Sequence, residues 1–177
     1  MVDEVAMGRY FSEYVNQRAK ELEISLWYVA YYSEISETAF NKYMKGVRLA
    51  RPTTLIMIAE LFECTVNELL GYPRVHIPRK NNKFNSGLDT KRMLEHFYSE
   101  VARLMIRKRI SIDELAEYIG VTSPTLESYF KYNTLHDGST MVRICEALEC
   151  TPSELLGYWY FCFKKLCLVL YLSVSRK

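Results

Sequence analysis

Four basic residues near the middle of the first half of the chain could bind phosphate groups. Lys42, Lys45, Arg48 and Arg51 share their stretch with a single acid, Glu37. Lys and Arg side chains that neutralise backbone phosphates supply most of the affinity of a protein for DNA. The cluster therefore indicates a nucleic-acid surface, although the net charge of the whole chain is only +2.

Polar residues in the same stretch could read bases. A helix that begins after Ser36 would turn Phe40 and Tyr43 toward the core. Its opposite face would carry an Asn, which can bond bidentately to adenine, and a Lys, which can donate to guanine. The predicted base contacts are Glu37, Thr38, Asn41 and Lys42. The predicted phosphate contacts are Ser25, Ser36, Lys45, Arg48 and Arg51.

Nothing in the sequence indicates catalysis, a cofactor or a metal. The chain has no glycine-rich phosphate loop and no nucleophile set that contains a His. There are three His, and the five Cys do not have the spacing of a zinc site. We expect a protein that is not an enzyme, with its thiols mostly buried in a reducing cytosol.

The chain repeats itself at a fixed distance. Residues 64–72 read CTVNELLGY and residues 150–158 read CTPSELLGY. The same offset continues upstream without a gap, and it aligns Phe11 with Phe97. A long period of this kind predicts two copies of one domain. The predicted organisation is a first domain at 1–72, a basic linker at 73–92, a second domain at 93–158 and a hydrophobic C-terminal tail at 159–177.

Each repeat is predicted to form five short helices. Capping boxes of the S/T-x-x-E type begin at Thr65, Ser111 and Thr151. Ser139 or Thr140 is expected to open the fourth helix of the second repeat. No stretch before the tail alternates strictly enough to indicate a strand, so the predicted fold class is all-α.

A segment of the second repeat, SIDELAEYIGVTSPTLESYFK (111–131), resembles the phage Cro/repressor family of helix-turn-helix proteins. The family usually has a glycine in the turn, present here as Gly120 but replaced by Glu34 in the first repeat. The resemblance covers both repeats and implies two tandem five-helix helix-turn-helix domains. It also implies a repressor-type transcriptional regulator that reads double-stranded DNA with the third helix in the major groove.

The second repeat is less suited to DNA than the first. The positions of the first repeat's basic cluster hold Ser128, Lys131, Thr134 and Asp137, and Glu127 is added. Exposed carboxylates oppose phosphate binding. We therefore predict that the first repeat reads DNA. A possible second reader consists of Ser123, Ser128 and Lys131.

Three aromatic residues of the first repeat, Trp27, Tyr28 and Tyr31, occupy positions that are acidic in the second. An apolar patch there could pack within the chain, dimerise, bind a protein partner or stack on single-stranded bases. A rival function is therefore a protein-interaction module on the same scaffold, similar to an antitoxin or an inhibitor, that grips a protein partner.

The linker and the tail add two further expectations. Arg74, Arg79, Lys80 and Lys83 make the linker either a solvated spacer or a basic arm along phosphates. The tail's uncharged run, 166–175, is shorter than the roughly 20 residues that a membrane span needs, so we expect no membrane contact. Its aromatic and branched residues must be covered by the chain itself or by a second subunit, and we favour a homodimer element. Because the N-terminus lacks the long apolar core of a signal peptide, the expected location is cytoplasmic.

Overall fold

The computed structural model describes residues 3–72 and 90–157, and every regular element in these ranges is an α-helix. The N-terminal group of helices consists of α1 (Glu4–Glu21), α2 (Leu26–Tyr32), α3 (Glu37–Met44), α4 (Pro52–Leu61) and α5 (Val66–Leu69). The C-terminal group consists of α6 (Thr90–Lys108), α7 (Ile112–Ile119), α8 (Ser123–Tyr132), α9 (Gly138–Ala147) and α10 (Pro152–Leu155). The all-α prediction is confirmed for the described part of the chain.

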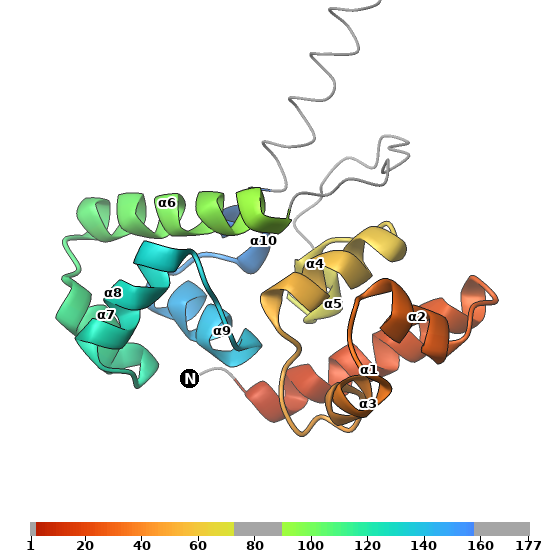
Figure 1. Ribbon diagram of the computed structural model, residues 1–177. Coiled ribbons are helices and arrows are strands. Elements are labelled where there is room, and N and C mark those ends of the chain that lie inside the picture. The colour runs from red at the N-terminus through yellow and green to blue at the C-terminus, as the bar shows by residue number, and fades with distance from the viewer. Residues whose placement is uncertain (1–2, 73–89, 158–177) are drawn as a thin grey trace, which may run out of the picture.

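The two groups have the same order of helices and turns. Each helix of the C-terminal group begins 86 residues after one of the N-terminal group, at 4 and 90, 26 and 112, 37 and 123, 52 and 138, and 66 and 152. Left-handed backbone (positive φ) recurs with the same offset at 23 and 109, 34 and 120, 63 and 149, and 71 and 157. Figure 1 shows the two groups side by side, with α5 and α10 on the sides that face each other.

The predicted capping boxes begin the helices where the sequence placed them. At Ser111 the hydroxyl accepts the Glu114 N–H at 3.2 Å, and the Glu114 carboxylate accepts the Ser111 N–H at 2.7 Å. These hydrogen bonds hold the pKa of Glu114 below its ordinary value. The boxes that begin α5 and α10 have the same reciprocal pattern.

Two predicted boundaries differ from the structure. Asp137, rather than Ser139 or Thr140, caps α9, because its carboxylate accepts the Ser139 N–H at 3.2 Å. Helix α6 already begins at Thr90, so 90–92 belong to the helix and not to the linker. The linker's basic residues and the predicted tail, 159–177, lie outside the described residues.

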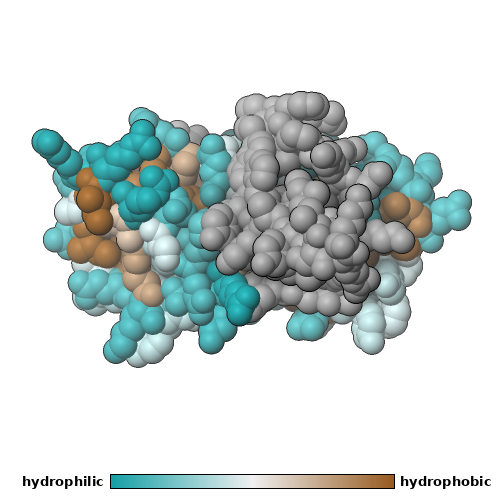
Figure 2. All heavy atoms as spheres, turned by 90° about the horizontal axis from the view of Figure 1, so that it is seen from above, coloured by the Kyte–Doolittle hydropathy of each residue, from teal (hydrophilic) through white to brown (hydrophobic). Residues whose placement is uncertain are grey.

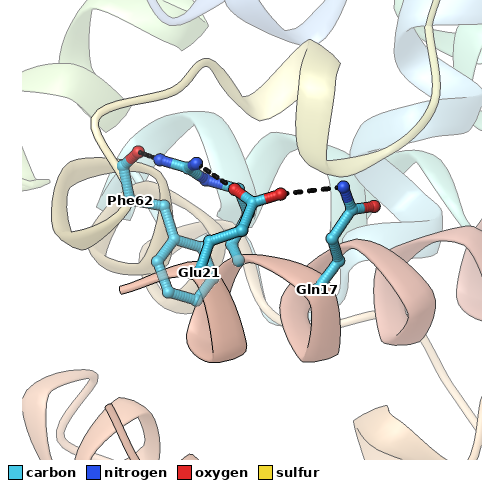
Figure 3. A network of polar contacts seen from close by, with 4 residues as sticks. Gln17, Glu21 and Phe62 are labelled. Carbon is cyan, nitrogen blue, oxygen red and sulfur yellow. Dashed lines mark hydrogen bonds and ion pairs between the residues drawn. The ribbon is translucent and has the colours of Figure 1, made fainter. Parts of the chain in front are cut away.

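A polar network fastens α1 to the end of α4 (Figure 3). Gln17 Nε2 donates to the Glu21 carboxylate at 2.8 Å, and the Arg18 guanidinium pairs with the same carboxylate. Arg18 Nη2 also donates to the Phe62 carbonyl at 3.1 Å. The C-terminal carbonyls of a helix have no intrahelical partner, so Arg18 satisfies one of them and fixes α1 on α4. The network therefore fixes the two helices on which α2 and α3 pack.

Candidate nucleic-acid interface

Helices α2 and α3 follow each other across a short turn. The Ser25 hydroxyl accepts the Tyr28 N–H at 3.1 Å and begins α2, while the Ser36 hydroxyl accepts a backbone N–H at 3.2 Å and begins α3. The small side chain of Ala30 is only 3% exposed, which lets α3 pack closely on α2. Glu34 makes the turn with φ of 54°. The turn therefore adopts a left-handed conformation without the glycine that favours it.

Helix α3 separates buried aromatic residues from exposed polar ones. Phe40 and Tyr43 are 2% and 1% exposed, and they anchor the helix in the core. The predicted base-reading residues all lie exposed on the helix, namely Glu37, Thr38, Asn41 and Lys42. The helical period thus brings these four side chains to one accessible surface.

The basic residues continue this surface beyond the end of α3. Lys45 follows the last helical residue, and Arg48 and Arg51 lie in the loop toward α4, all three exposed. The Arg48 guanidinium carbon lies 5.2 Å from the centre of the Tyr43 ring, which orients it by a cation–π contact. Ser25 and Ser36 are also exposed, and their hydroxyl hydrogens remain able to donate while the oxygens cap the helices.

In the C-terminal group, α7 and α8 also follow each other across a short turn, but they present a different surface. Ser123 is half-buried, and its hydroxyl donates to the Asp113 carboxylate from α7. Ser128 is half-buried too, whereas Lys131 is exposed with its ammonium 5.3 Å from the centre of the Tyr132 ring. Only Lys131 of the three predicted second-reader residues is therefore exposed, and the Asp113 carboxylate lies at the start of α8.

The three aromatic residues on α2 are exposed. Trp27, Tyr28 and Tyr31 have 61%, 40% and 67% of their surface accessible. The rings of Trp27 and Tyr31 stack with centroids 5.3 Å apart and an interplanar angle of 12°. Together the three side chains form an exposed aromatic patch on α2.

An open apolar hollow of about 460 Å³ lies on the C-terminal group, where the end of α6 meets the start of α7 and Phe130. Viewed from above, the coloured surface of that group shows hydrophobic atoms among hydrophilic ones (Figure 2). Arg109 is the single charged residue among those that line the hollow, so its lining does not indicate a catalytic or metal site. Within 3–72 and 90–157, no set of His, Cys, Asp and Glu could hold a metal ion, and none of the helices is long and apolar enough to cross a membrane.

Residues 100–159 match the family model of the Cro/C1-type HTH DNA-binding domain. The chain carries a DNA-binding helix-turn-helix domain. The match runs from within α6 past the end of α10, so the motif inside it is α7 and α8. No curated protein and no solved structure matched the chain.

The Cro/C1-type pattern and the basic surface lie in different halves of the chain. The matched region contains the acidic residues Asp113 and Glu127, while the exposed cluster around Lys45 lies in the N-terminal group. The bond between Asp113 and Ser123 could not be predicted from sequence, because it depends on how closely α7 approaches the start of α8. In the sequence, the two residues are marked only by their spacing of ten positions.

Proposed function

We propose that the protein is a sequence-specific transcriptional regulator of the repressor type that binds double-stranded DNA. The observation that carries this proposal is the exposed face of α3, where polar side chains lead into a run of Lys and Arg. The Cro/C1-type domain at 100–159 supports the same function class. In helix-turn-helix proteins the second helix of the motif enters the major groove. Helix α3 is that helix in the N-terminal group.

The roles of individual residues follow from their chemistry. Asn41 would pair bidentately with an adenine and Lys42 would donate to a guanine, with Glu37 and Thr38 beside them. Phosphates would be held by the exposed cations and the two capping hydroxyls, which are Ser25, Ser36, Lys45, Arg48 and Arg51. Base edges would thus be read along α3, and phosphates would be held by residues at its ends and at the starts of α2 and α4.

We further propose that the two helix groups are tandem copies of one helix-turn-helix domain. The common 86-residue offset of all five helix starts supports this. So does an equivalent pair of contacts, in which Tyr32 lies beside Glu60 and Tyr118 lies beside Glu146. In both pairs desolvation, and then the carboxylate, raises the pKa of the tyrosine.

Selection of bound sequences from random duplex DNA tests the proposed function. The expected result is an enriched sequence whose complex with the full chain weakens steeply as salt rises. Recovery of DNA without any enriched sequence, or no recovery at all, would contradict sequence-specific binding. A shuffled duplex of the same length and composition serves as the control.

The aromatic patch favours a second candidate, an antitoxin-like or inhibitor-like module that grips a protein partner through Trp27, Tyr28 and Tyr31. Replacing Trp27 and Tyr31 by Ala would abolish that function and leave duplex binding intact. Replacing the exposed Tyr132 by Ala provides a matched control away from the patch. Loss of duplex binding in the first variant alone would instead place the patch in the DNA interface.

A homodimer through the C-terminal tail stays a prediction. Deleting 159–177 is expected to halve the sedimenting mass while the helical circular dichroism signal is kept. The prediction fails if the full chain already sediments as a monomer at micromolar concentration, or if the truncated chain loses its helices.

A further inference from the structure

Two reciprocal hydrogen bonds join the helix groups at equivalent positions. The N–H of Asn67 in α5 donates to Ser153 Oγ at 3.1 Å, and the N–H of Ser153 in α10 donates to Asn67 Oδ1 at 3.0 Å. The two residues are 86 positions apart, and they are 5% and 1% exposed. First-turn amides of a helix have no intrahelical acceptor. Each short helix therefore caps the other in a buried contact.

Such reciprocity is the mark of a two-fold arrangement. In an isologous contact the same patch meets itself, so that residue i touches j and j touches i. A head-to-tail arrangement would instead place Asn67 against a residue other than its own counterpart. The view in Figure 1 agrees, because α6 runs along one outer edge, α1 runs along the opposite one, and α5 and α10 lie between them.

The contact is nevertheless built for two unlike partners. A Cβ on Gly138, at the start of α9, would come within 2.3 Å of the Ala50 carbonyl oxygen. The equivalent position in the N-terminal group is Pro52, which could not fit there. An ion pair of 2.8 Å also joins Arg143 to Glu4, and the counterpart of Arg143 is the uncharged Met57. Two N-terminal groups could therefore not form the same contact.

On the basis of the proposed DNA binding, we infer that the two helix groups of one chain bind DNA together, as the two subunits of a two-fold dimer do. Helix-turn-helix dimers place their reading helices on half-sites about 34–36 Å, or roughly 10 base pairs, apart. The contact between α5 and α10 holds the two helix groups of a single chain in one relative orientation. Its ligand is a duplex with two unlike half-sites, because α3 leads into Lys45 while α8 begins beside Asp113.

The spacing of the selected DNA site tests this inference with the full chain. Inserting five base pairs between the half-sites turns the second one to the opposite side of the duplex. Affinity should then fall about tenfold, since a rigid pair of units can no longer reach both halves. Units joined only by a flexible linker would tolerate the insertion, so unchanged affinity overturns the inference. If the chain binds no duplex at all, the result contradicts the proposed DNA binding itself, and the inference of two half-sites is contradicted with it.

Amide hydrogen exchange tests the contact itself without DNA. Ser153→Ala removes the acceptor of the Asn67 N–H, so exchange at Asn67 should accelerate about tenfold. Asn67→Ala should do the same at Ser153. Ser99→Ala is the matched control, because the Ser99 hydroxyl donates to the Glu95 carbonyl within α6. Unchanged exchange in both interface variants would overturn the intramolecular contact.

Gly138→Ala provides a second variant if Ser153→Ala or Asn67→Ala loses its helical signal. The new methyl group meets the Ala50 carbonyl and should push the groups apart while each keeps its helices. Exchange at both Asn67 and Ser153 should then accelerate together, and the DNA site should tolerate the five-base-pair insertion. Retained protection at both amides would overturn the inference.

Discussion

Individual side chains on α3 and just beyond it are expected to set how strongly the protein holds DNA. Lys45→Ala or Arg48→Ala should weaken binding to all duplexes alike and reduce the slope of log K against log salt by about one unit each. Lys131→Ala, at the position equivalent to Lys45, is the matched control and should have a smaller effect. Salt titrations of the three variants decide the matter, and a larger loss from Lys131→Ala would assign the reading role to the C-terminal group.

Asn41 should discriminate between bases. A good bidentate contact is worth about 1–3 kcal/mol against the wrong base. Asn41→Ala should therefore lower affinity for the selected site by roughly tenfold or more and leave affinity for random DNA nearly unchanged. Asn16→Ala is the control, because Asn16 is exposed on α1 and donates to the carbonyl of Ser12. An unchanged ratio between selected and random DNA would remove Asn41 from the reading surface.

The exposure of these residues could be predicted from the sequence, because the start of a helix and its period together fix the face on which each residue lies. Once Ser36 is taken as the cap, Phe40 and Tyr43 must share one face and Asn41 must lie on another. The Asp113–Ser123 bond and the Asn67–Ser153 bonds could not be predicted in this way. Both depend on how two helices approach each other, which no local pattern encodes.

At the scale of helices, starts were predictable where one capping residue stands alone. Ser25, Ser36 and the three capping boxes begin helices as expected. The start of α9 was missed because Asp137, Ser139 and Thr140 are all good caps within one turn. Asp137 takes the role since its carboxylate reaches the N–H two residues on. Competing caps of equal propensity are resolved by packing, which here brings Gly138 against Ala50.

The turn between α2 and α3 should become more stable with glycine. A non-glycine residue in the left-handed region costs about 1–2 kcal/mol, and Glu34 has φ of 54°. Glycine relieves this cost, but it also raises the conformational entropy of the unfolded chain, which lowers stability. Glu34→Gly should therefore raise the free energy of unfolding by a net amount of up to about 1 kcal/mol. Gly120→Ala, at the equivalent turn with φ of 76°, should lower it by about 1 kcal/mol.

Urea unfolding measures both effects. Glu34→Ala is the control, because it removes the carboxylate but keeps a Cβ in the left-handed turn. If Glu34→Ala stabilises the chain as much as Glu34→Gly does, the cause is the charge and not the backbone conformation.

At the scale of the whole molecule, the contact between α5 and α10 should couple the stability of the two groups. Leu55 is fully buried in the N-terminal group, and truncating such a residue costs about 2–5 kcal/mol. Leu55→Ala should therefore accelerate amide exchange in α10 as well as in α5, because α5 is one of the helices on which α10 packs. Exchange in α7 and α8 should change much less, since α7 packs on α8 and on α9 and neither packs on α5. Val5→Ala, at an exposed position of α1, is the control. If α10 keeps its wild-type exchange rate in Leu55→Ala, the two groups open independently, and the contact between them does not transmit stability.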